Sequence, residues 1–441
     1  LDFQGVTGVV GDIGLVVDPS KDNIDSGHHL LCVMVIEPSE LMWAIADLPS
    51  RLSLGYYHIV SDVWHSDSHM KQLALGWEMA AYCYDRYLTE SNKKGLKNSQ
   101  DNQAPTLVVS SSVIAEVTPM IEAITLVRDL INTPAQDLLP AQMSKVVKEL
   151  AQKYDANFQS LVGDDLKKEG YHAIYTVGKA SESPPRLLEL TWGNPESPKI
   201  TLVGKGVCFD SGGLNLKPTS GMGLMKKDMG GSAVVLGIAY ALMSLNCPVN
   251  LRVILPLAEN SVSEKSMRPL DVVYSRNQTP VEIGNTDAEG RLLLADALTY
   301  CQESKIKSDF ILDFATLTGA ARVALGTELP ALFTNNDNLG EQIINEGIKQ
   351  IDPMWRLPLF KPYNKQLDKN NNAISSTGSS GTGGAITAAL FLNRFIDKNT
   401  NWAHVDLMAW NTSSRPGFPI GGEAMGLRNI VNMIIKYCSK S

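Results

Sequence analysis

Short apolar runs alternate with helical segments after residue 200, and this alternation limits the folds open to the chain. The pattern predicts strands at 200–203, 251–255, 310–314 and 403–408, and helices at 231–245, 292–302 and 384–396. Such an alternation predicts α/β layers around a mostly parallel sheet. Because ligands of these sheets bind at the carboxyl ends of strands, we expect them at the ends of strands 200–209 and 281–285.

The chain has 441 residues, which is long enough for two domains with separate cores. We expect a smaller N-terminal α/β domain over residues 1–130, whose last part, at about 111–131, is a long linking helix. A larger α/β domain is expected over residues 131–441. Within the first domain a helix is predicted around 70–87, and the polar segment 90–104 is predicted to be a surface loop or a flexible insertion.

Residues 285–292 place two carboxylates and a guanidinium at alternate positions, in Asp287, Glu289 and Arg291. Carboxylates this close repel each other unless a strong positive charge lies between them, and a divalent metal is the usual one. Arg291 adds a planar cation that is suited to holding an anion beside such a metal. The alternative is a solvated loop in which Asp287 caps the helix that continues through Leu298.

A second cluster follows the apolar run 200–203 and contains Lys205, Asp210, Lys217 and Asp228 among many glycines. Glycines allow tight turns and a close approach of the backbone to a ligand. Together the two clusters supply the carboxylates that two divalent ions need when histidine is not used, namely Asp210, Asp228, Asp287 and Glu289. A lysine can join such a set only as the neutral amine.

Two other kinds of site are excluded by the same segments. The chain contains no H-E-x-x-H pair, so a thermolysin-type zinc site is absent. A dinucleotide fingerprint is excluded because Gly204-x-Gly206 lacks the third glycine at the required offset.

The segments VGKGVCFDSGGLNLKP (203–218) and NTDAEGRLLLADAL (285–298) resemble the signatures of the leucyl aminopeptidase family, and the likeness covers roughly residues 115–441. It continues through DFATLTGAARVALG, WRLPL, GGAITAALFLNRF and WAHVDLMAW. The details AARVALG and PIGGEAMGLR look closest to the bacterial peptidase B-like branch. The resemblance implies a cytosolic metalloprotease, a hydrolase with two metals per subunit in its C-terminal catalytic domain, which assembles as a homohexamer.

The resemblance also implies a role for each matching residue. Asp210 and Glu289 correspond to the two carboxylates that bridge both metals. Lys205 and Asp228 correspond to further ligands of the tighter site, and Asp287 to a further ligand of the more exchangeable one. Zinc or manganese are the expected metals, with magnesium or cobalt also compatible with carboxylates and one amine.

Two cationic residues are implied to be catalytic. Lys217 matches the lysine that donates to the oxygen of the tetrahedral intermediate, and Arg291 matches the arginine that holds a bicarbonate ion as general base. Two metals can share a hydroxide, because they lower the pKa of bound water toward about 7. A metal that also binds the free α-amine of a peptide restricts cleavage to the N-terminal residue.

The pocket for the first side chain of the substrate is implied to include Met225, Thr316, Leu317 and Gly319. A methionine there gives an adaptable apolar wall, which favours leucine or other apolar N-terminal residues. The alternatives are that Met225 is ordinary core and that the 316–319 segment is a plain strand-to-loop turn.

Composition predicts an ordinary soluble protein, with 44% apolar and 20% charged residues. A net charge of −8 argues against nucleic acid or an anionic membrane as the main partner, and no apolar stretch is long enough for a membrane span. No secretory signal is recognisable. Six scattered cysteines without C-x-x-C predict reduced thiols and a cytoplasmic location, and a nucleophilic Cys208 is the weaker alternative for its segment.

The chain departs from the family pattern in places that bear on substrate range and turn geometry. Leu270 stands where the family has glycine after Arg268-Pro269, and residues 368–375 differ from the usual segment. The Ser/Gly-rich stretch 375–384 is predicted to be a loop. Two other functions therefore stay open: a metal hydrolase with a shifted substrate, such as a Cys-Gly dipeptidase, and a non-enzymatic scaffold or DNA-binding member.

Overall fold

The computed structural model describes eight stretches of the chain, which are residues 13–16, 28–33, 41–52, 55–59, 66–89, 105–303, 307–369 and 372–439. The chain divides into two compact units, one of Leu1–Thr125 with Thr412–Ile420 and one of Leu126–Asn411 with Gly421–Ser441. The predicted polar loop at 90–104 lies outside the described residues. Among the described residues, no helix combines the length and the apolar character needed to cross a membrane.

The first unit contains a four-stranded sheet in the order β1-β2-β3-β4. Its elements are β1 (Ile13–Val16), β2 (His28–Val33), α1 (Leu41–Ala44), α2 (Leu48–Arg51), β3 (Tyr56–Ile59), α3 (Asp67–Ala81) and β4 (Thr106–Leu107). Helix α3 ends at Ala81, so the predicted helix to residue 87 was too long. Tyr82, Cys83 and Tyr84 follow it, and these residue types favour helices only weakly. Helix α5 (Ser111–Asn132) begins in this unit and ends in the second.

The second unit is built on a nine-stranded sheet in the order β14-β13-β16-β12-β7-β9-β6-β5, with β8 paired to β9. Its strands are β5 (Asn157–Val162), β6 (Arg186–Trp192), β7 (Lys199–Gly204), β8 (Gly206–Asp210), β9 (Asn250–Asn260), β12 (Phe310–Ala315), β13 (Ala331–Thr334), β14 (Trp355–Arg356) and β16 (Trp402–Asp406). The four central strands β16, β12, β7 and β9 are parallel, while β5, β6 and β13 add antiparallel pairs. The predicted mostly parallel α/β fold is confirmed.

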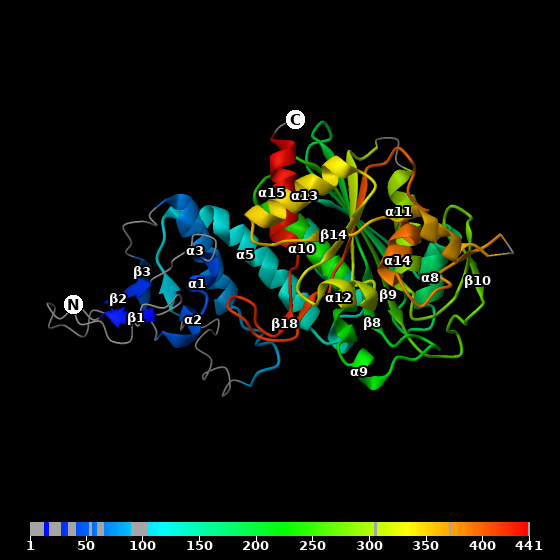
Figure 1. Ribbon diagram of the computed structural model, residues 1–441, viewed down its shortest axis with the longest axis horizontal. Helices are drawn as coiled ribbons and strands as arrows, with labels where there is room; N and C mark the ends of the chain where they lie inside the picture. The colour runs from blue at the N-terminus through cyan, green and yellow to red at the C-terminus, as the bar shows by residue number, and fades with distance from the viewer. Residues whose placement is uncertain are drawn as a thin grey trace. The chain divides into compact units, whose positions relative to one another are not determined.

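Helices cover both faces of this sheet (Figure 1), with α10, α13 and α15 on one side and α8, α11 and α14 on the other. Helices of this unit are α6 (Pro140–Lys153), α7 (Asp164–Lys168), α8 (His172–Gly178), α9 (Thr219–Met222), α10 (Gly230–Ser244), α11 (Gly290–Gln302), α12 (Gly319–Leu325), α13 (Asp337–Lys349), α14 (Gly384–Asn393) and α15 (Leu427–Cys438). Short 3-10 helices are η3 (Ala135–Asp137), η4 (Met225–Met229) and η5 (Lys361–Leu367). Helix α10 is buried from Gly230 to Met243, as expected of a helix that is apolar all round.

Two small sheets complete the second unit, and one of them corrects a prediction. Strand β11 (Pro280–Glu282) pairs with β10 (Val272–Tyr274) and β15 (Ile374–Ser375), so it belongs to a separate three-stranded sheet. The prediction that strands 200–209 and 281–285 end at the carboxyl edge of one sheet is therefore wrong for strand 281–285. Strand β11 forms a hairpin with β10 and takes its other partner, β15, from a distant segment that local sequence does not indicate. Strands β17 (Trp410–Asn411) and β18 (Gly421–Gly422) form the other small sheet.

Leu270, which replaces the family's glycine, has φ of 70°, in the left-handed region that glycine favours. A leucine in this conformation costs about 1–2 kcal/mol because its Cβ crowds the next carbonyl oxygen. We therefore expect Leu270→Gly to stabilise the protein by about 1 kcal/mol, since its side chain is exposed and packs on little. Denaturant unfolding would measure this, with Leu216→Gly as the control at an exposed leucine of negative φ. An unchanged or lower stability of Leu270→Gly would refute the strain.

Candidate metal centre

Five segments of the second unit bring the predicted metal-binding residues together. Lys205 is the single residue between β7 and β8, and Asp210 is the last residue of β8. Asp228 lies in η4, Asp287 follows β11, and Glu289 is the residue just before α11. Three of these residues lie within 205–228 and the other two within 287–289, so the complete cluster exists only in the folded unit.

Lys205 occupies the buried side of the cluster, with a 3% exposed fraction. Its Nζ lies 2.7 Å from Asp228 Oδ2 and 3.1 Å from Glu289 Oε1, and donates to the backbone oxygen of Thr316 at 3.1 Å. Burial lowers the pKa of Lys205, but nearby carboxylates, chiefly Asp228 and Glu289, outweigh this and raise its pKa above the ordinary value. The ammonium group thus neutralises carboxylates that would otherwise repel one another.

Lys217 also neutralises carboxylates, on the more open side of the cluster. Its Nζ lies 2.8 Å from Asp210 Oδ2 and also pairs with Asp287. Burial lowers the pKa of Lys217, but Asp210 and Asp287 more than compensate, so its pKa lies above the ordinary value. Lys217 is therefore a cation at neutral pH, positioned between two carboxylates.

The carboxylates meet closely enough to share a metal. Asp210, Asp287 and Glu289 each offer an oxygen within 4.8 Å of the others. Glu289 is 1% exposed, and its Oε2 has no hydrogen-bond partner. Burial, with the nearby Asp210, raises the pKa of Glu289 to about 8. A buried carboxylate oxygen without a partner is unfavourable unless a cation satisfies it, so the residues present fit a divalent metal.

Asn260 and Thr286 form hydrogen bonds that support Asp210 and the loops beside it. Neither residue was predicted from the sequence. Asn260 Nδ2 donates to Asp210 Oδ1 at 2.8 Å and to the backbone oxygen of Thr286 at 3.1 Å. Thr286 Oγ1 donates to the backbone oxygen of Gly212 at 2.6 Å and accepts from the Asn215 backbone at 2.8 Å. These bonds join the loop after β8 to the loop after β11. The position of Asn260 at the carboxyl end of a buried strand was the available signal.

Arg291 lies in the first turn of α11 and is 8% exposed. Its Nη1 donates to the backbone oxygen of Ser376 at 2.6 Å, and its Nε has no hydrogen-bond partner. Burial lowers the pKa of Arg291 to about 10, against the opposing effect of Glu289. The guanidinium therefore stays charged at neutral pH and keeps a buried donor free for an anion.

The predicted substrate-pocket residues lie in η4, which also contains Asp228, and in the segment after β12, where Thr316 contacts the cluster. Met225 begins η4 and is 8% exposed, and Thr316 follows β12 with a hydroxyl that donates to Asp228 Oδ1 at 2.7 Å. Leu317 is partly buried, and Gly319 begins α12. The 316–319 segment is thus hydrogen-bonded to the carboxylate cluster, which a plain surface turn would not be.

Cys208 is fully buried in β8, and burial raises the pKa of its thiol. A protonated, inaccessible thiol is a poor nucleophile. The alternative of a nucleophilic Cys208 therefore has no support in the geometry.

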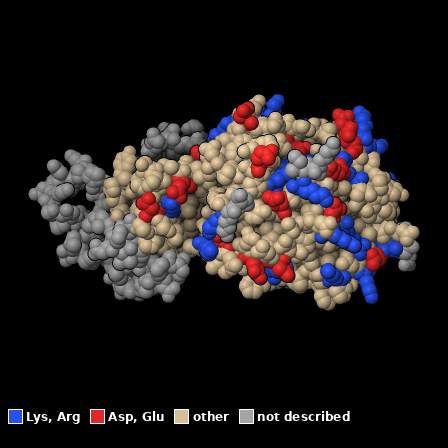
Figure 2. Space-filling view, turned by 90° about the horizontal axis from the view of Figure 1, so that it is seen from above, with Lys and Arg blue, Asp and Glu red and all other residues tan. Residues whose placement is uncertain are grey.

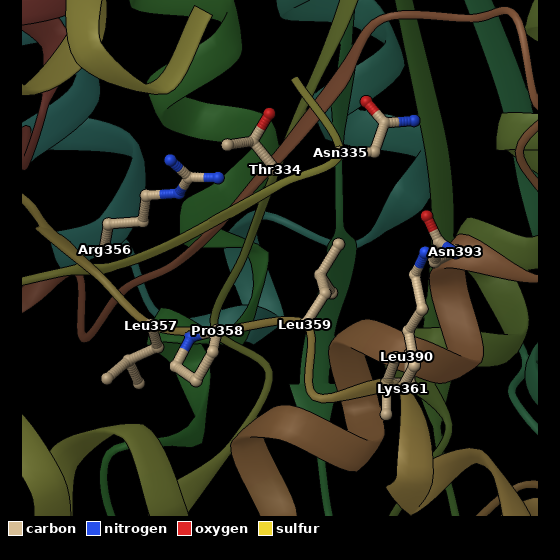
Figure 3. Close-up of a pocket in the computed structure, with 9 residues that line it drawn as sticks. All are labelled: Thr334, Asn335, Arg356, Leu357, Pro358, Leu359, Lys361, Leu390 and Asn393. Carbon is tan, nitrogen blue, oxygen red and sulfur yellow. The ribbon is translucent and has the colours of Figure 1, made fainter. Parts of the chain in front are cut away.

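A separate cavity of about 490 Å³ lies at the β14-β13 edge of the sheet (Figure 3). Arg356 lies at one end of it, and Lys361 and Asn393 lie at the other. On its wall, Thr334 Oγ1 already donates to Trp402 and Asn335 Nδ2 to Thr400. None of the predicted site residues lines this cavity.

One family model, described as "Cytosol aminopeptidase family, catalytic domain", matches residues 125–431, the part of the chain that contains this cluster. The chain belongs to the cytosol aminopeptidase family. A second model, the N-terminal domain of M17 aminopeptidases, matches residues 7–96. The predicted family, two-domain α/β fold and metal-dependent aminopeptidase class are confirmed.

Other cytosol aminopeptidases are similar over most of their length. A probable cytosol aminopeptidase of Sinorhizobium fredii is 40% identical over 341 residues, which are 76% of this chain and 68% of that protein. One of Phytoplasma mali is 37% identical over 353 residues, covering 78% and 70%.

Solved structures of similar proteins share the fold. The crystal structure of a cytosol aminopeptidase from Coxiella burnetii matches with a TM-score of 0.90 and 40% identity, covering 98% of this chain and 91% of that one. A bottromycin maturation enzyme, BotP, in complex with Mn matches with a TM-score of 0.86 and 31% identity, covering 96% and 93%.

Proposed function

We propose that this chain uses two divalent ions to release leucine or other apolar residues from the N-termini of peptides. The observation that carries the proposal is the meeting of three carboxylates, Asp210, Asp287 and Glu289, within 4.8 Å around an unpartnered buried oxygen. A purely structural cluster would have its buried oxygens satisfied by protein donors.

Asp210 and Glu289 would be shared between the two ions. Lys205, which would lose its ammonium proton when the metal binds, and Asp228 would complete one position, and Asp287 the other. Zinc or manganese suit this donor set best, and magnesium or cobalt are compatible with it. When bound, the ions would supply an activated water at neutral pH and polarise the scissile carbonyl.

The two remaining cationic side chains, Lys217 and Arg291, have different roles. Lys217 is a charged donor beside Asp210 and Asp287, placed to stabilise negative charge that develops on the carbonyl oxygen. Arg291 would hold a bicarbonate ion through its free Nε, and such an ion would supply a general base beside the cluster. Lys217 would therefore stabilise charge, and Arg291 would serve proton transfer.

The side-chain preference would come from Met225 together with Thr316, Leu317 and Gly319. Met225 offers a flexible apolar wall, and the 316–319 turn is held in place by its bonds to the cluster. A shifted preference, such as for Cys-Gly, remains the second hypothesis, and turnover measured across a set of dipeptides separates the two.

The chain is further proposed to act in the cytoplasm as a homohexamer on peptide substrates. Relatives named cytosol aminopeptidases support the location. On the face drawn in Figure 2, Lys and Arg are interspersed with Asp and Glu, and the net charge of −8 does not favour a nucleic-acid partner.

Asp287→Ala in metal-stripped protein tests the proposal. Adding zinc or manganese to the stripped wild type should restore hydrolysis of a leucyl fluorogenic amide, whereas the variant should stay at least about 100-fold less active, because outer-sphere changes alone cost 10–100-fold. Glu341→Ala, an exposed acid on α13, is the control and should behave as wild type. A folded wild-type protein that is inactive with every metal would refute the proposed function.

A further inference from the structure

The carboxylate of Asp406, the last residue of β16, is 3% exposed and fully engaged. Its Oδ1 accepts from the backbone nitrogens of Leu317 at 3.0 Å and Thr318 at 3.1 Å. Its Oδ2 accepts from Thr318 Oγ1 at 2.6 Å. All three donors belong to the turn that connects β12 to α12, so one side chain determines the path of that turn.

The same turn contacts the carboxylate cluster from its other side. The backbone oxygen of Thr316 accepts from Lys205 Nζ at 3.1 Å, and its hydroxyl donates to Asp228 Oδ1 at 2.7 Å. These are the two residues that would complete one metal position. Leu317, whose nitrogen Asp406 holds, is also a predicted wall of the substrate pocket.

We propose that Asp406 is a positioning residue, which orients Lys205 and Asp228 and shapes the substrate pocket by fixing the Thr316–Thr318 turn. The inference rests on the proposed metal-dependent function but assigns a residue outside its ligand set. Asp406 itself touches neither ligand side chain in any hydrogen bond of the described residues.

Only a carboxylate satisfies all three donors of the turn, because it accepts at both oxygens and donates at neither. An asparagine has the same shape but turns an NH₂ group toward one donor. If its oxygen keeps the two backbone N–H groups, the Thr318 hydroxyl loses its acceptor. That hydroxyl oxygen also accepts from the Ala321 nitrogen at 3.0 Å and so caps α12. If the hydroxyl turned to find another acceptor, this cap would be weakened too.

The charge of Asp406 contributes as well. Burial lowers the pKa of Arg291, while the negative charges of Glu289 and Asp406 oppose that effect. Asp406 thus favours the charged form of Arg291 and also holds the turn by hydrogen bonds.

Asp406→Asn is the test, measured by Mn²⁺ binding, by kcat and KM on a leucyl amide, and by amide hydrogen exchange of residues 316–321. We expect Mn²⁺ affinity to fall about 10–100-fold at one of two sites, as for other outer-sphere changes, with a raised KM. Exchange in the 316–321 segment should speed up even in metal-free protein.

Asp313→Asn is the matched control, because Asp313 is an equally buried carboxylate in the neighbouring β12. It bonds Trp402 Nε1 at 2.7 Å and His404 Nδ1 at 2.5 Å rather than the turn. It should lower thermal stability without the selective loss of Mn²⁺ affinity. If both variants lower Mn²⁺ affinity equally, or if Asp406→Asn binds Mn²⁺ and substrate as wild type does, the proposal is wrong.

Thr316→Val provides the route-specific check, since it removes the hydroxyl bond to Asp228 and leaves Asp406 intact. In the double variant the loss of Mn²⁺ affinity should be smaller than the product of the two single losses, because both changes break one chain of contacts. Multiplying losses would overturn the proposed route. Should Asp406→Asn not fold, Thr318→Val gives a milder version, and wild-type Mn²⁺ affinity in it would count against the proposal. Wild-type protein that itself binds no Mn²⁺ would instead refute the proposed function.

Discussion

Glu289→Gln is expected to lower aminopeptidase activity more than about 100-fold, since a lost ligand should exceed the 10–100-fold cost of an outer-sphere change. The same variant is expected to stabilise the metal-free protein. Glu289 is 1% exposed, and its Oε2 has no hydrogen-bond partner. Glutamine keeps the shape and is neutral without taking up a proton on folding, and its amide can donate to neighbouring carboxylates.

The pKa of Glu289 determines how the stability of the metal-free protein changes with pH. Burial raises the pKa of Glu289 to about 8 in the folded, metal-free protein, well above its ordinary value. The folded state therefore binds a proton that the unfolded state releases, and stability falls as pH rises from about 4.5 to 8. Glu289→Gln should flatten that fall and gain at least about 1 kcal/mol at neutral pH.

Thermal melts in chelator between pH 5 and 8, together with turnover in saturating Mn²⁺, measure both effects. Glu341→Gln is the matched exposed control and should change neither. A Glu289→Gln protein with wild-type turnover would remove Glu289 from the ligand set. A lower melting temperature across the whole pH range would contradict the buried-charge argument.

Gly231→Ala is expected to destabilise the catalytic unit by about 3 kcal/mol or more and to abolish activity with it. Gly231 is the second residue of α10, where the helix docks on the sheet. A Cβ there would lie 2.1 Å from the backbone oxygen of Phe314 and 3.0 Å from the nitrogen of Lys205. Those two backbone atoms bond each other at 2.9 Å, so neither can move away alone.

Denaturant unfolding checks this, with Gly223→Ala as the control. At Gly223 an added Cβ would meet nothing closer than Thr219 O at 3.7 Å, which is an ordinary contact. The control should stay within about 0.5 kcal/mol of wild type, the usual range for surface changes. A Gly231→Ala protein as stable as the control would show that α10 can shift freely on the sheet.

Elements with a strong local pattern could be predicted from sequence. The helix expected at 231–245 is α10, Gly230–Ser244, and the strand expected at 310–314 is β12, Phe310–Ala315. Apolar periodicity and flanking glycines are properties of neighbouring residues, so they are readable locally. The pairing of β11 is not local, since it depends on hydrogen bonds to β15 from a distant segment.

The candidate site divides in the same way. Lys205, Asp210, Asp228, Asp287 and Glu289 lie in two recognisable motif segments, and the structure brings them into one cluster. Their roles as ligands remain a prediction. Asn260 ends β9 with no motif around it. Asp406 ends β16 inside the family-like segment WAHVDLMAW, but that segment does not reveal which loop its carboxylate bonds. Only the strand order, which sequence does not reveal, makes them neighbours of the site.

The cluster and its supports run from Lys205 to Asp406, and β7 and β12, which are adjacent in the sheet, are far apart in the chain. A nascent chain therefore has no complete site until β16 has left the ribosome and joined the sheet. In partly folded chains the carboxylates would be separated and would not form a high-affinity metal site. Metal uptake is thus expected to follow folding, and turnover reports on chains that have completed their sheet.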